Sequence, residues 1–89
     1  MHAVRHKQNA QIILTEFEDG EGILIDVRKK KYYRLNETAL LIWRGLAQSL
    51  TPANIIAQLT SQYEVTSGEA QAHFSALLQD FQVRGLLSQ

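Results

Sequence analysis

The amino-acid sequence predicts an α+β domain in which a three-stranded antiparallel sheet is followed by three helices, in the order βββααα. Up to residue 35, short runs of β-branched and aromatic residues alternate with turn residues, which is typical of strands. From residue 37 onward, apolar residues recur every three or four positions, which indicates helices. No repeat or linker divides the 89 residues, so we expect a flexible tail over residues 1–9 and a single domain over residues 10–89.

Three strands are expected, over residues 11–17, 22–28 and 31–35. In the second strand, Ile23 and Ile25 share one face and Leu24 points to the other. The first two strands are expected to pair, and a short basic turn joins the second strand to the third in a hairpin. The outer edge of the third strand then stays open.

The first helix is expected over residues 37–48, with Asn36 as its N-cap. Leu35 and Leu40 have the spacing of a hydrophobic staple, which fixes the angle between strand and helix. Gly45 weakens a helix interior, so a close packing contact is expected there. The helical spacing of an inward, core-facing stripe is shared by Ala39, Ile42, Trp43, Leu46 and, just beyond the helix, Leu50.

Two further helices have recognisable ends. Thr51 and Pro52 open the second helix as N-cap and first helical residue. Thr66 and Glu69 have capping-box spacing at the start of the third helix. Arg84 and Gly85 end it, with Leu86 placed to pack on Phe81 in a Schellman motif. The inward stripes of these helices are predicted to contain Ile55, Ile56, Leu59, Tyr63, Ala70, Phe74, Leu77, Leu78 and Phe81.

The composition excludes several functions. The chain has no cysteine, which removes thiol nucleophiles and thiolate metal sites and fits a cytoplasmic location. It has no apolar stretch long enough for a signal peptide or a membrane helix. The three histidines, His2, His6 and His73, form no pattern with acidic residues that predicts a metal site or a catalytic centre. We therefore expect no enzyme activity, no cofactor, no metal and no membrane partner.

A binding module remains, and its partner could belong to one of two classes. DNA recognition calls for basic and amide side chains on one helix, but the expected third helix offers Gln71, Gln79 and Gln82 and a single basic residue, Arg84. Nine basic and nine acidic residues give zero net charge, which is unusual for a nucleic-acid-binding domain.

The other class is an extended peptide that adds to the open edge of the third strand. Basic residues cluster around this strand and its turn: Arg28, Lys29, Lys30, Lys31 and Arg34. They could attract an acidic partner, or they could simply protect an open edge or form a solvated turn.

A family resemblance rests on the junction between the third strand and the first helix. The chain resembles the PqqD-like proteins, also called RiPP recognition elements, over about residues 10 to 88. The matching positions are Asp26, Val27, Arg28, Tyr32, Tyr33, Leu35, Asn36, Thr38, Ala39, Ile42 and Trp43, followed by Arg84, Gly85, Leu86 and Leu87. Such proteins commonly have glycine where this chain has Lys30, so a turn with positive φ at this position would cost roughly 1 kcal/mol.

The resemblance implies a winged-helix-like fold and a non-catalytic function. It implies that the leader segment of a ribosomally made precursor peptide docks along the third strand and the facing surface of the third helix. Carried over by position, the strand side of this groove is Lys31, Tyr32, Tyr33, Arg34 and Leu35, and the helix side is Ala72, His73, Ala76, Leu77, Asp80 and Val83. Alternation sends Tyr32 and Tyr33 to opposite faces and leaves open which one faces the peptide.

The implied partners are enzymes that process the bound precursor. We expect presentation to a leader peptidase and a cyclase in lasso-peptide biosynthesis. The alternative within the family is a peptide chaperone of coenzyme PQQ assembly or of another radical-SAM peptide modification. The alternative from a different class is a winged-helix DNA-binding regulator.

Overall fold

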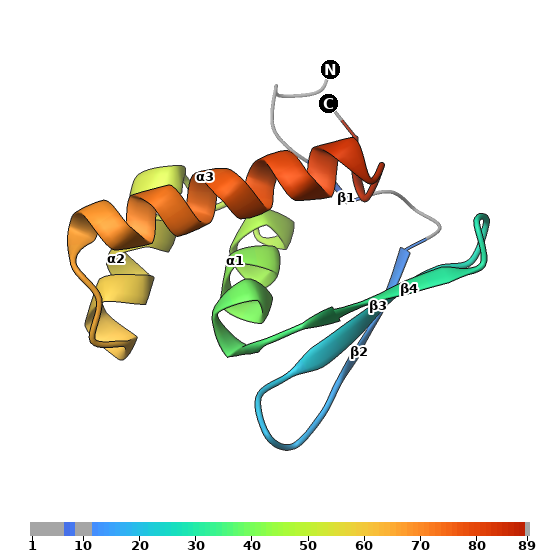
Figure 1. The fold of residues 1–89 in the computed structure, drawn as a ribbon, viewed down its shortest axis with the longest axis horizontal. Coiled ribbons are helices and arrows are strands. Elements are labelled where there is room, and N and C mark those ends of the chain that lie inside the picture. The colour runs from blue at the N-terminus through green and yellow to red at the C-terminus, as the bar shows by residue number, and fades with distance from the viewer. Residues whose placement is uncertain (1–6, 9–11, 89) are drawn as a thin grey trace.

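The computed structural model describes residues 7–8 and 12–88 and consists of a three-stranded sheet beside three helices (Figure 1). The strands β2 (Ile12–Glu16), β3 (Gly22–Asp26) and β4 (Lys31–Leu35) are antiparallel, in the order β2-β3-β4. The helices α1 (Glu37–Ala47), α2 (Pro52–Gln62) and α3 (Ser67–Val83) follow. The predicted α+β class and the order of three strands and three helices are confirmed.

Two very short strands were not predicted. β1 (Lys7–Gln8) pairs antiparallel with β5 (Leu87–Ser88), close to the end of the chain. Residues 7–8 of the expected tail thus form a short strand, whereas residues 1–6 and 9 of that tail lie outside the described residues. Two-residue strands have no periodic pattern, and this pairing exists only because the turn after α3 returns the chain to this place.

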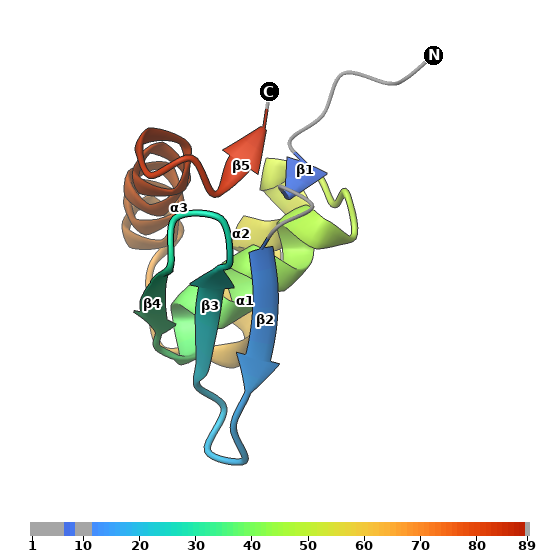
Figure 2. The same cartoon turned by 90° about the vertical axis from the view of Figure 1, so that its right-hand side faces the viewer.

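The two faces of the sheet differ in their surroundings. Leu24 pairs with Leu14 and Tyr33, and it is fully buried on the face that packs on the helices. Ile25 pairs with Ile13 and Tyr32 on the opposite face. Figure 2 shows this opposite face toward the viewer, with the helices behind the sheet. The predicted alternation of residues 23–25 is confirmed.

The β3–β4 turn is organised by Asp26. Its buried carboxylate accepts hydrogen bonds from the backbone N–H groups of Arg28 and Lys29, at 3.1 and 3.0 Å. The chain bends there, so the strand ends two residues earlier than predicted. Lys30 has φ of 58°, so this turn does place a residue with a side chain in the left-handed region.

The predicted helix caps are present. Asn36 Oδ1 accepts from the backbone N–H of Ala39 at 2.9 Å, and Thr51 caps α2 in the same way. Thr66 and Glu69 exchange both bonds of a capping box at the start of α3. The three helix starts therefore depend on local side-chain chemistry, as the sequence indicates.

The end of α3 is a Schellman motif. Leu86 N–H donates to the carbonyl of Phe81 at 2.9 Å, Gly85 N–H donates to Gln82 at 3.1 Å, and Gly85 has φ of 73°. This turn buries Leu86 together with Phe81 in the core. The predicted stop of the third helix is confirmed.

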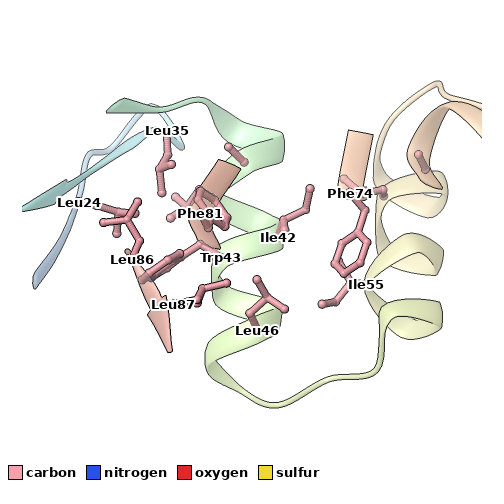
Figure 3. Close-up of a cluster of buried hydrophobic side chains, with 14 residues drawn as sticks. Leu24, Leu35, Ile42, Trp43, Leu46, Ile55, Phe74, Phe81, Leu86 and Leu87 are labelled. Atoms are coloured by element: carbon pink, nitrogen blue, oxygen red, sulfur yellow. The ribbon is translucent and has the colours of Figure 1, made fainter. Parts of the chain in front are cut away.

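The core lies where the sheet and the three helices meet (Figure 3). The rings of Trp43 and Phe81 make an edge-to-face contact with centroids 5.2 Å apart. Gly45 lies against α2, where an added Cβ would stand 2.6 Å from Ile55 Cγ1. The predicted burial of Trp43 and the predicted close contact at Gly45 are both confirmed. Some predicted core positions are only partly buried, namely Leu50, Ile56, Tyr63, Leu77 and Leu78.

Candidate functional site: a groove between β4 and α3

A groove of about 570 Å³ runs between β4 and α3. Figure 2 shows β4 as the strand of the sheet on the same side as α3. Its deepest part is apolar, since Leu35, Ala39, Phe81 and Leu86 are buried members of the core. The remaining lining residues are Glu21, Tyr33, Arg34, Asn36, His73, Leu77, Asp80 and Arg84.

The strand side of the groove is set by the alternation along β4. Tyr33 and Leu35 point to the helix side and line the groove, while Tyr32 points to the other face and is 73% exposed. Arg34 lies at the rim of the groove. The structure therefore decides which tyrosine faces the groove, because only the position of α3 gives the two faces of the strand different surroundings.

The helix side is one stripe of α3 and its C-cap. His73, Leu77, Asp80 and Arg84 are spaced by four, three and four residues, which places them on the same helix face. Val83, Ala72 and Ala76 are exposed and lie on a neighbouring stripe outside the groove lining.

Two ion pairs stand at the rim of the groove. Arg34 contacts Glu21 at 2.8 Å, and Arg84 Nε contacts Asp80 Oδ1 at 2.9 Å. The hydrogen bond and the charge of Asp80 raise the pKa of Arg84 above its usual value, and the guanidinium also lies 5.1 Å from the centroid of the Tyr33 ring. Arg84 thus contacts both the strand side and the helix side of the groove.

Polar contacts connect α3 to the rest of the fold at two places along the groove. The hydroxyl of Thr38 on α1 lies 2.9 Å from His73 Nε2. Lys29 Nζ donates to the carbonyl of Arg84 at 3.1 Å and so connects the β3–β4 turn to the C-terminus of α3. The groove therefore has walls whose separation is held by contacts at both ends.

The edge of β4 beside this groove is open. Within the described part of the chain, β4 pairs only with β3 and ends the sheet. An edge strand presents backbone N–H and C=O groups that can bond to an added strand. An extended peptide in the groove would lie along these groups.

The structure brings six of the eleven predicted site residues together in the groove: Tyr33, Arg34, Leu35, His73, Leu77 and Asp80. It leaves five outside the lining: Lys31, Tyr32, Ala72, Ala76 and Val83. Tyr32 faces away because of strand alternation, and the other four are exposed beside the groove.

Six lining residues were missed by the sequence interpretation: Glu21, Asn36, Ala39, Phe81, Arg84 and Leu86. Arg84 could have been found, since it continues the spacing of His73, Leu77 and Asp80 by one more turn. Glu21 could not, because it comes from the β2–β3 turn and reaches the groove only through the sheet register.

Neither a membrane-spanning helix nor a metal site is present among the residues that the structure describes. None of their helices is both long and apolar enough to cross a bilayer. No three histidine, aspartate or glutamate side chains within residues 7–8 and 12–88 are grouped closely enough to hold a metal ion.

A groove beside an open strand edge is typical of small domains that bind an extended peptide as an added strand. Residues 21–87 match the model of the family described as coenzyme PQQ synthesis protein D (PqqD), and the chain belongs to this family. No curated protein matches the chain.

Two solved structures are similar to the whole chain. One is a lasso peptide synthetase B1 solved in complex with the leader peptide, and it is 29% identical in sequence. The match covers 97% of this chain and 100% of that protein's chain, with a TM-score of 0.87. TbiB1 in complex with the TbiA(beta) leader peptide is 18% identical, with coverage of 92% and 94% and a TM-score of 0.84, which shows a shared fold.

Proposed function

We propose that this protein binds the leader segment of a ribosomally synthesised precursor peptide. The leader adds as a strand to the open edge of β4 and packs its side chains into the groove against α3. The observation that carries this proposal is the apolar-floored groove directly beside an edge strand with no partner among the described residues.

The chemistry of the groove supports a peptide of mixed character. Leu35, Phe81 and Leu86 offer apolar contact at the floor, and charges stand at the rim. Exposed ion pairs contribute only about 0–1 kcal/mol, so Arg34 and Arg84 can exchange their present partners for leader carboxylates at little cost. Backbone bonds to β4 would supply affinity, and these side chains would supply register.

The similarity to a lasso peptide synthetase B1 supports one pathway. That protein is similar over its full length and was solved with a leader peptide. We therefore propose a non-catalytic role in lasso-peptide biosynthesis, in which the bound precursor is presented to a leader peptidase and a cyclase. Coenzyme PQQ assembly or another radical-SAM modification is the alternative within the family. The cytoplasmic location stays a prediction.

The DNA-binding alternative has little support. Within Ser67–Val83, α3 contains no lysine or arginine, and the next residue, Arg84, is already paired with Asp80. Phosphate contacts need several basic side chains, which this helix does not offer.

The experiment is a titration of the purified protein with two probes. One is the synthetic leader of the precursor encoded beside its gene, and the other is a short DNA duplex at moderate salt. We expect a dissociation constant of about micromolar or below for the peptide alone. Tight DNA binding that weakens steeply with salt would contradict the proposal.

Adjacent tyrosines provide matched variants for the site. Tyr33→Ala removes a groove wall and should weaken leader binding by about tenfold or more, whereas Tyr32→Ala on the opposite face should change it less than about twofold. Thermal unfolding of both variants checks that each is folded. Equal effects of the two substitutions would place the peptide elsewhere.

The exposed stripe beside the groove is tested separately. Ala76→Glu adds a charge outside the groove lining, so the fold should be retained. Weaker leader binding by this variant would extend the site to Ala72, Ala76 and Val83, as the sequence predicts. Unchanged binding would restrict the site to the groove.

A further inference from the structure

The sheet face that points away from the helices is mostly apolar. We call it the outer sheet face. Its strand residues form two cross-strand rows, one of Ile13, Ile25 and Tyr32 and the next of Thr15, Ile23 and Arg34, and Phe17 and Val27 are exposed just beyond the strand ends. Tyr32 is 73% exposed, Val27 52% and Ile13 51%. Figure 2 shows no helix in front of this face.

Neither the core nor the groove explains this surface. The core uses the opposite face through Leu14, Leu24 and Tyr33, and the groove also lies on that side. The solvent-exposed face of an antiparallel sheet usually carries polar residues. Here the cross-strand row of Ile13, Ile25 and Tyr32 is apolar from one edge of the sheet to the other. A contiguous exposed apolar surface of this kind marks an interaction site.

The two ends of the outer sheet face have opposite charge. The β3–β4 turn at one end contains Arg28, Lys29 and Lys30, and the β2–β3 turn at the other end contains Glu18 and Asp19. Among the described residues, Arg28, Lys30, Glu18 and Asp19 make no ion pair. These charges are therefore available to a partner that covers the face.

This distribution is complementary to itself. If two copies pack these faces together about a two-fold axis perpendicular to the strands, the strands of the copies run in opposite directions. The basic turn of each copy then meets the acidic turn of the other. An axis parallel to the strands would instead bring like charges together. The antiparallel arrangement therefore covers the apolar centre of each face and brings opposite charges together at both ends.

We propose that the protein self-associates through its outer sheet face, as a two-fold dimer with antiparallel face-to-face sheets. Three strands of five residues make a face of roughly 15 by 17 Å, well below the area of a stable interface, so the dimer is weak and forms at about 0.1 mM protein and above. The grooves lie on the far sides of the two sheets and stay accessible. The inference is independent of the proposed function.

Sedimentation velocity of the full chain over a concentration series tests self-association. We expect the mean mass to rise from 10.1 kDa toward twice that value between about 10 µM and 1 mM. Ile13→Lys and Tyr32→Lys should each weaken association at least tenfold, while Val65→Lys, an exposed control between α2 and α3, should associate like the unmodified chain. Thermal unfolding confirms that each variant is folded.

A charge exchange tests the orientation of the two copies. Arg28→Glu and Glu18→Arg should each weaken association severalfold, and the double variant should restore it, because each swapped charge again meets its opposite. A monomer at 1 mM would overturn the proposal, as would Ile13→Lys associating like the unmodified chain. Failure of the double variant to recover would overturn the antiparallel arrangement.

Discussion

At the scale of single residues, Trp43 joins α1 to α3 in the core. It lies on α1, it is buried, and its ring meets the edge of Phe81 from α3. Two residues further along α1, Gly45 lets α2 approach so closely that Ile55 occupies the place of a side chain. The large side chain of Trp43 thus sets the distance from α1 to α3, and the absent side chain of Gly45 sets the distance from α1 to α2.

We predict that Trp43→Ala lowers the free energy of unfolding by about 3–5 kcal/mol, because the substitution leaves a cavity that the surrounding side chains fill only partly. Urea denaturation measures this change. Val83→Ala removes a side chain that is 77% exposed and should stay within about 0.5 kcal/mol of the unmodified protein. A small effect at Trp43 would show that the packing in Figure 3 does not determine stability.

Lys30 gives a prediction of the opposite sign. Its φ of 58° is unfavourable for a residue with a Cβ, so Lys30→Gly should raise the free energy of unfolding by up to about 1 kcal/mol. Arg28, in the same turn, has no positive φ, and Arg28→Gly should not stabilise the protein. If Lys30→Gly and Arg28→Gly both stabilised the protein, the cause would not be backbone strain at Lys30.

At the scale of elements, β4 has two roles that follow from its place in the sheet. Its inward residues Tyr33 and Leu35 contribute to the groove and the core, while its edge carries backbone groups without a partner strand among the described residues. α3 covers one side of this strand through a single stripe of residues. Strand and helix therefore form one binding surface, although β4 begins at Lys31 and α3 begins far away in the sequence, at Ser67.

Amide hydrogen exchange tests strand addition at this element. We predict that exchange across Lys31–Leu35 slows when the leader peptide binds, because edge N–H groups gain acceptors. Proline in place of a leader residue that donates to β4 should cost roughly 1–3 kcal/mol of binding free energy. Protection confined to α2, with β4 unchanged, would show that the leader binds elsewhere.

At the scale of the whole molecule, the sheet and the helices share one core. Leu24 from β3, Trp43 from α1, Ile55 from α2, Phe74 from α3 and Leu86 beyond it belong to the same buried cluster. Neither part has a separate core of its own in the described residues. The two parts should therefore fold together.

We predict a single cooperative unfolding transition. The chain has one tryptophan, so its fluorescence reports on the core at Trp43, and far-ultraviolet circular dichroism reports on the helices. Both signals should give the same denaturant midpoint, as two-state unfolding requires. Loss of the fluorescence signal at lower denaturant than the helical signal would instead show helices that persist without the shared core.

Much of this architecture was predictable because its signals are local. Asn36, Thr51 and Thr66 cap helices through atoms within three residues, and Gly85 ends α3 within five. The pairing of β1 with β5 and the contribution of Glu21 to the groove were not predictable, since both join segments that the sequence keeps far apart.

The sequence by itself determined the order of the elements, the helix ends, the buried Trp43 and the open edge of β4, because periodicity and capping act over a few residues. The tertiary structure alone decided that Tyr33 rather than Tyr32 faces the groove and that Glu21 joins its lining. The physical reason is that a strand has two equivalent faces until another element packs on one of them. Here α3 makes that choice through its position over β4.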